Sequence, residues 1–186
     1  MNTILFIIYT NTLVWLLVPI RQYNTRFFLF FLVLGLFDPV FISSYYIFKL
    51  DISTLYLIGT VLLLYLALLD FKKINRLILS WVFLIIGTVV AFHYKEKIAL
   101  VELVIHLIIF FNFLRITLKE YSTSRQVLFF SIFLITYEIS LIVKFFMSIS
   151  QVDLGVFYFH FTSIIQVALG ILFLFINEKN SPLIKI

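Results

Sequence analysis

The chain contains no cysteine and few charged residues for its length. Without a thiol it can form no disulfide, no thiolate metal site and no cysteine nucleophile. Charged residues make up 12% of the chain, whereas soluble domains average about 25%. A chain of 186 residues of which 63% are hydrophobic cannot hide its apolar surface in a water-soluble fold. We therefore expect an integral membrane protein that contacts the lipid bilayer.

Basic clusters of the kind that bind nucleic acid are also missing. The net charge is a modest +5, and the Lys and Arg residues fall between apolar runs rather than in a patch or stripe. No nucleic-acid partner is expected from this distribution. The first apolar run has no Lys or Arg before it, so it lacks the basic region of a secretory signal peptide. We expect this first helix to stay in the mature chain.

Long apolar runs are what the chain does have. A helix that crosses a bilayer takes about 20 mainly apolar residues. Breaking the sequence at its charge clusters gives seven such runs, at residues 3–20, 27–48, 54–69, 77–92, 98–118, 127–148 and 155–176. The connections are short, so consecutive helices should be antiparallel neighbours. The predicted fold is all-α, a single domain of seven transmembrane helices over residues 1–186, with no soluble or output domain of its own.

The positions of the basic residues orient this predicted bundle. The odd-numbered loops and the C-terminal tail carry ten Lys and Arg, whereas the N-terminus and the even-numbered loops carry three. Because Lys and Arg accumulate on the cytoplasmic side of a membrane, the N-terminus is predicted outside and the C-terminus in the cytoplasm. The 24 Phe and five Gly are a composition common in AT-rich bacterial genomes. The expected location is therefore the inner membrane of a bacterium, with multiple passes.

Five ionisable side chains lie inside the predicted spans, between the midplane and the outer surface. They are Asp38, Glu102, His106, Glu138 and His160. Such a group costs about 2.5 to 3.5 kcal/mol in a span, so it faces a protein interior or a wet cavity rather than lipid. The spacing of four puts Glu102 and His106 on one helix face, and Gln166 belongs to a polar stripe on the last run. We predict that these six side chains line a ligand-binding cavity open to the outer face.

Structural interpretations of the same residues remain open at this point. Glu102 and His106 can form a buried hydrogen-bonded pair that fixes helix packing, and His160 can be a satisfied structural histidine. Lys144 lies roughly one turn from the end of its run. We therefore expect the Lys144 side chain to snorkel to the outer surface.

Asp38 also has a structural interpretation, because Pro39 follows it. Proline removes a backbone donor and predicts a kink in the second helix. The Asp38 carboxyl group would then cap the backbone groups that the proline sets free.

Three classes of function fit this pattern. The first is a sensor-like or accessory subunit that binds a small polar or cationic ligand, or protons, and acts through a partner membrane protein or as a homo-oligomer. The second is a small-solute or proton transporter, although the inner half of the spans is almost bare of ionisable groups.

The third class is an intramembrane enzyme, which is less expected. The chain has no HExxH motif and no histidine cluster, so no metal or other cofactor is predicted. A single haem held by His106 and His160 is the one cofactor geometry that the histidines leave open.

Overall fold

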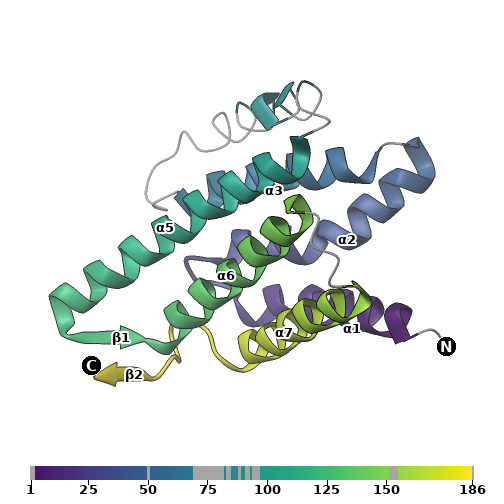
Figure 1. Ribbon diagram of the computed structural model, residues 1–186. Coiled ribbons are helices and arrows are strands. Elements are labelled where there is room, and N and C mark those ends of the chain that lie inside the picture. The colour runs from purple at the N-terminus through teal and green to yellow at the C-terminus, as the bar shows by residue number, and fades with distance from the viewer. Residues whose placement is uncertain are drawn as a thin grey trace.

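Helices make up most of the chain in the computed structural model (Figure 1). The structure describes residues 3–49, 51–68, 97–150 and 155–185, together with 82, 85–87, 89, 90 and 93. The helices with defined bounds are α1 (Thr3–Arg21), α2 (Phe28–Phe48), α3 (Ile52–Leu68), α5 (Ile98–Ser124), α6 (Phe129–Ile149) and α7 (Gly155–Phe175). Two short strands are β1 (Gln126–Leu128) and β2 (Leu183–Lys185). The chain is thus predominantly helical, as predicted. The predicted run 77–92 lies outside the described residues except at isolated positions.

The helix ends follow local sequence signals. Lys49 adopts a left-handed conformation after α2, and its backbone N–H donates to the Tyr45 carbonyl at 3.0 Å. Asp51 caps the start of α3, because its carboxylate accepts from the backbone N–H of Thr54 at 3.0 Å. The fifth predicted run was too short, since α5 continues six residues past residue 118 to Ser124. Its last two turns are polar, and they remain helical until Arg125 adopts a left-handed conformation.

The six described helices form a closed ring, called here the helix ring. Each helix packs chiefly against two others, in the order α1, α2, α3, α5, α6, α7 and back to α1. Successive helices run antiparallel from α1 to α3, and again from α5 to α7. Helices α3 and α5, in contrast, run in the same direction (Figure 1). We call the end of the helix ring where Thr3 and Ile98 lie the N-terminal end. The opposite end, where Leu68 and Phe175 lie, is called the C-terminal end.

The outward faces of the helices are apolar. Among the described helices, α2, α5 and α6 are long and apolar enough to cross a membrane. Large apolar side chains on the outer surface are more than half exposed, among them Tyr9, Ile47, Phe111, Phe146 and Phe161. Soluble proteins rarely expose such large contiguous apolar surfaces. The surface therefore indicates association with a membrane.

Aromatic side chains fill the C-terminal half of the helix ring. The most deeply buried phenylalanines, each at most 2% exposed, are Phe30, Phe31, Phe113, Phe130 and Phe173. The Phe31 and Phe173 rings have centroids 4.8 Å apart, and Trp15 stacks on Phe31 at 6.4 Å. This aromatic cluster, as we call these five phenylalanines with Trp15, packs α1, α2, α5, α6 and α7 together.

The residues after α7 are tied to the C-terminal end of the helix ring. Buried Gln22 donates from Nε2 to the carbonyls of Phe173 and Ile176, at 2.8 and 3.0 Å, and so caps the end of α7. Strand β2 pairs antiparallel with β1, with Gln126 opposite Lys185. No strand was predicted in this tail, which the sequence presents as a short polar segment.

Two glycines allow α1 to fit between α2 and α7. A Cβ atom on Gly35 would lie 2.4 Å from the main-chain oxygen of Trp15. A Cβ atom on Gly170 would lie 2.6 Å from Cγ1 of Val14. Small residues permit this close approach of membrane helices. Both contacts set the position of α1, which carries part of the site described below.

Replacing Gly35 by alanine should destabilise the helix ring. The new methyl group would meet a main-chain carbonyl that no side-chain rotation can move, at a cost of about 1–3 kcal/mol. Thermal unfolding of the purified chain in detergent measures the effect. Leu36→Ala is the matched control, because the neighbouring Leu36 side chain is 41% exposed. Equal melting temperatures for the two variants would contradict the close contact between α1 and α2.

Candidate functional site

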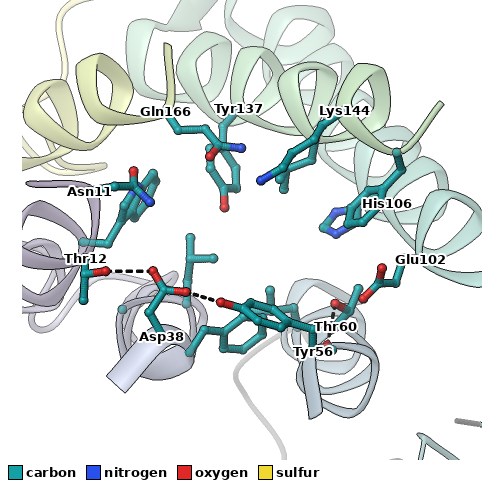
Figure 2. Close-up of a pocket in the computed structure, with 17 residues that line it drawn as sticks. Asn11, Thr12, Asp38, Tyr56, Thr60, Glu102, His106, Tyr137, Lys144 and Gln166 are labelled. Atoms are coloured by element: carbon teal, nitrogen blue, oxygen red, sulfur yellow. Dashed lines mark hydrogen bonds between the residues drawn. The ribbon is translucent and has the colours of Figure 1, made fainter. Parts of the chain in front are cut away.

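A polar cavity of about 170 Å³ lies inside the helix ring. Figure 2 shows the polar side chains that line it. The polar residues of the lining lie nearer the N-terminal end than the aromatic cluster does. Each of the six described helices contributes at least one polar side chain to its lining. These polar residues are Asn11, Thr12, Asp38, Tyr56, Thr60, Glu102, His106, Tyr137, Lys144 and Gln166. Because the lining comes from every helix of the ring, the cavity depends on the ring being closed.

Asp38 connects three helices at one side of the cavity. Thr12 on α1 donates to its Oδ2 at 3.0 Å, and the Tyr56 hydroxyl on α3 donates to its Oδ1 (Figure 2). Helix α2 continues through Pro39. The prediction that Asp38 caps freed backbone groups is therefore wrong, because its carboxyl group accepts from side chains of the neighbouring helices. The carboxyl group is satisfied while it faces the cavity.

His106 and Glu138 join α5 to α6 at the opposite side. His106 Nδ1 lies 2.8 Å from Glu138 Oε2, and the two residues are 3% and 0% exposed. The His106 ring also stacks on Phe145, with centroids 5.3 Å apart. One interpretation of the sequence was that His106 forms a hydrogen-bonded pair with Glu102. This interpretation is wrong, because His106 pairs with Glu138 on α6. Glu138 Oε1 has no hydrogen-bond partner in the described part of the chain.

Glu102 and Lys144 face the cavity, and among the described residues neither side chain has a hydrogen-bond partner. Glu102 shares the cavity-lining face of α5 with His106, as the spacing of four predicted. Lys144 was expected to snorkel outward, but it lines the cavity and points into it (Figure 2). Across the described ranges, neither side chain makes an ion pair within 4.0 Å. An acidic and a basic side chain thus line the same small space without direct contact.

The structure brings four of the six predicted site residues to the cavity. These four are Asp38, Glu102, His106 and Gln166. Glu138 lies one hydrogen bond behind His106. His160 is half-buried on α7 but is not part of the lining. His106 and His160 therefore do not share this cavity, which removes the support for a haem between them. No three His, Asp or Glu of the described residues are grouped as metal ligands.

Sequence reasoning missed part of the lining on α3 and α6. Tyr56 and Thr60 are four residues apart and so share a helix face, and this spacing was an available signal. Lys144 was assigned to the outer surface because it lies near the end of its run. Tyr137, seven residues from Lys144, is the informative neighbour, because seven residues are about two helical turns. Both Tyr137 and Lys144 line the cavity.

No protein-family model, no curated protein sequence and no solved structure matches this chain.

The contact between His106 and Glu138 can be tested by a double-mutant cycle. Glu138→Leu leaves a buried imidazole nitrogen without a partner and should cost about 1–3 kcal/mol. His106→Leu strands a buried carboxyl group and should cost about 3–5 kcal/mol. The double variant, which removes both polar groups, should lose less stability than the sum of the single losses.

Thermal unfolding in detergent provides the stabilities for this cycle. Thr136→Leu, at an exposed position of α6, is the control for a new leucine on that helix. Strictly additive losses for His106→Leu and Glu138→Leu would show that the two side chains are not coupled.

Proposed function

We propose that the chain is a multi-pass protein of a bacterial inner membrane, with seven spans in a single domain. In this arrangement the N-terminal end of the helix ring faces outside, and the C-terminal end faces the cytoplasm. The orientation is supported by the basic residues, because ten Lys and Arg fall on the cytoplasmic side and three on the outer side. The common direction of α3 and α5 supports the number of spans (Figure 1). Leu68 lies at the C-terminal end of the ring and Ile98 at the N-terminal end, as a further span between them would require.

We further propose that this protein is a sensor-like or accessory subunit whose cavity binds a small ligand from the outer side. The observation that carries the proposal is the polar cavity to which all six described helices contribute. Ligand sites in helical bundles commonly lie between the helices, where a few polar groups converge in an apolar surround. An ionisable group kept inside a membrane protein is a functional hypothesis by default, because its burial is costly.

The charges around the cavity favour a cationic or polar ligand. Among the described residues, Asp38, Glu102, His106 and Lys144 line it, and Glu138 lies behind His106. With Glu138 included, three carboxyl groups outnumber two basic side chains in surroundings of low dielectric, where charges interact strongly. The cavity of about 170 Å³ is smaller than the roughly 300–1,000 Å³ of sites for drug-sized ligands. An ammonium-bearing molecule of few heavy atoms fits these properties.

The aromatic cluster favours binding over transport. It separates the cavity from the C-terminal end, and a solute on its way through would have to part Phe31 from Phe173, whose ring centroids are 4.8 Å apart. A ligand that changes the hydrogen bonds of Asp38 would instead alter how α1, α2 and α3 pack. The change would reach a partner membrane protein, or a second copy of the chain, on the apolar outer faces.

Cysteine accessibility tests the outer opening of the cavity, because the chain has no cysteine of its own. Leu141 lines the cavity, whereas Val143 on the same helix is 43% exposed on the outer surface. Leu141→Cys should react from outside with a cationic methanethiosulfonate in intact cells. Val143→Cys should not react, because a thiol in lipid does not ionise.

The anionic methanethiosulfonate is the second arm of this experiment. We expect it to modify Leu141→Cys at least tenfold more slowly than the cationic reagent, because carboxyl groups surround the cavity. Equal reactivity of the cysteines at 141 and 143, or faster modification by the anionic reagent, would count against an outward-facing cation site.

Liposomes that contain the purified chain separate binding from transport. Radiolabelled methylammonium, a small cationic probe, should bind but should not cross the bilayer faster than in empty liposomes. Glu102→Gln should weaken its binding by about tenfold or more, because a charged hydrogen-bond partner is lost. Glu178→Gln, in the tail outside the cavity, is the control. Flux that depends on Glu102 would identify a transporter, and absence of binding to the unmodified chain would exclude this ligand class.

A further inference from the structure

A second site lies at the C-terminal end of the helix ring, far from the cavity. It is a groove of about 700 Å³ between the ends of α3 and α5 and the β1 segment. Its charged lining residues are Arg26, Arg115, Lys119 and Glu120. Three basic side chains against one carboxyl group give the groove a formal charge of +2. The groove is therefore suited to an anion.

Contacts with neighbouring residues hold two of the basic side chains in place. Arg115 Nη2 donates to Asn112 Oδ1 at 2.8 Å, and Asn112 Nδ2 donates to the Ala67 carbonyl at 2.7 Å. The Arg115 guanidinium is thus fixed relative to the end of α3. Arg26 places its guanidinium over the Phe27 ring, 5.2 Å from the centroid.

The basic side chains keep their capacity to bind an anion. Within the described residues, Arg26, Arg115 and Lys119 form no ion pair with a carboxylate. The carboxyl group of Glu120 instead accepts from the Ser131 hydroxyl at 3.2 Å. The guanidinium fork of arginine matches the geometry of a phosphate group.

The floor of the groove is apolar. Leu68, Ile116, Leu128 and Leu183 line it beside the basic groups. The groove also lies where the helices end, because Leu68 is the last residue of α3 and Arg26 precedes α2. A molecule that joins an anionic head to apolar chains matches this arrangement better than a free anion does.

We propose that this groove binds the headgroup of an anionic phospholipid, with the phosphate between Arg115 and Lys119. The upper part of the acyl chains lies against the leucine and isoleucine side chains. The proposal depends on membrane association but not on the ligand or function of the cavity. Bound lipid joins α3, α5 and β1 at the C-terminal end, where β1 also holds the tail strand β2.

Native mass spectrometry of the purified full chain in a neutral detergent tests this site. Dioctanoyl phosphatidylglycerol should bind at least tenfold more tightly than dioctanoyl phosphatidylcholine, which carries the same chains without net charge. The double variant Arg115→Gln with Lys119→Gln should reduce the phosphatidylglycerol affinity about tenfold or more, because each basic residue near anionic lipid contributes to binding. Lys179→Ala, at the same end but outside the groove, should leave the affinity unchanged.

Other results would show non-specific attraction, binding of free phosphate, or an unfolded variant. Equal affinity for the two lipids would overturn the proposal. So would a Lys179→Ala variant that loses as much phosphatidylglycerol affinity as the double variant, because the lipid would then be attracted by the basic end as a whole. Inorganic phosphate that binds as tightly as the anionic lipid would assign the groove to free phosphate instead. Circular dichroism and gel filtration show whether the double variant is folded. If it is not folded, Lys119→Gln alone, at an exposed position, should still weaken lipid binding measurably, and an unchanged affinity would reject the proposal.

Discussion

The carboxyl group of Asp38 holds two neighbouring helices to α2, and the polar half of the molecule depends on it. Thr12 and Tyr56 each donate to a different oxygen of this group. A carboxyl group in apolar surroundings is costly unless hydrogen bonds compensate for lost water. Both donors come from other helices, so this compensation exists only when α1 and α3 are in place. His106 and Glu138 likewise need each other as hydrogen-bond partners, so α5 and α6 have to lie side by side.

The N-terminal half of the helix ring contains a cavity, whereas side chains fill the C-terminal half. In the C-terminal half, phenylalanine side chains pack against one another and fill the centre of the helix ring. In the N-terminal half, the same helices carry side chains that bind one another at the walls and leave a cavity between them. The division explains why binding is a better proposal than passage, since the polar space ends at the aromatic cluster.

Helix positions were predictable from the sequence because each apolar run is bounded by charges. The described helices begin and end within about two residues of the predicted runs, except at the end of α5. There Lys119 and Glu120 were read as the end of the helix, although polar residues continue a helix readily outside an apolar layer. The pairing of β2 with β1 was not predictable, because three-residue strands carry no periodic pattern.

The sequence predicted which site residues share a face of the same helix. The spacing of four correctly placed Glu102 and His106 together, and the stripe on α7 correctly turned Gln166 inward. Which helices face each other across the ring is not encoded in local spacing. For this reason the partner of His106 was misjudged, and Lys144 was assigned to the surface. Helix periodicity gives the direction of a side chain relative to its own helix, whereas a partner is set by packing between helices.

We infer that the polar side chains share one hydrated space inside the helix ring, which in our proposal lies within the membrane. Water-edited solid-state NMR on the chain in lipid bilayers, with ¹⁵N-labelled histidine, measures this directly because the chain has three histidines. His106→Gln assigns the relevant signal. We expect the His106 ring to receive magnetisation from water at a rate comparable to that of exposed His93. A His106 ring that stays dry while His93 is wet would contradict the claim.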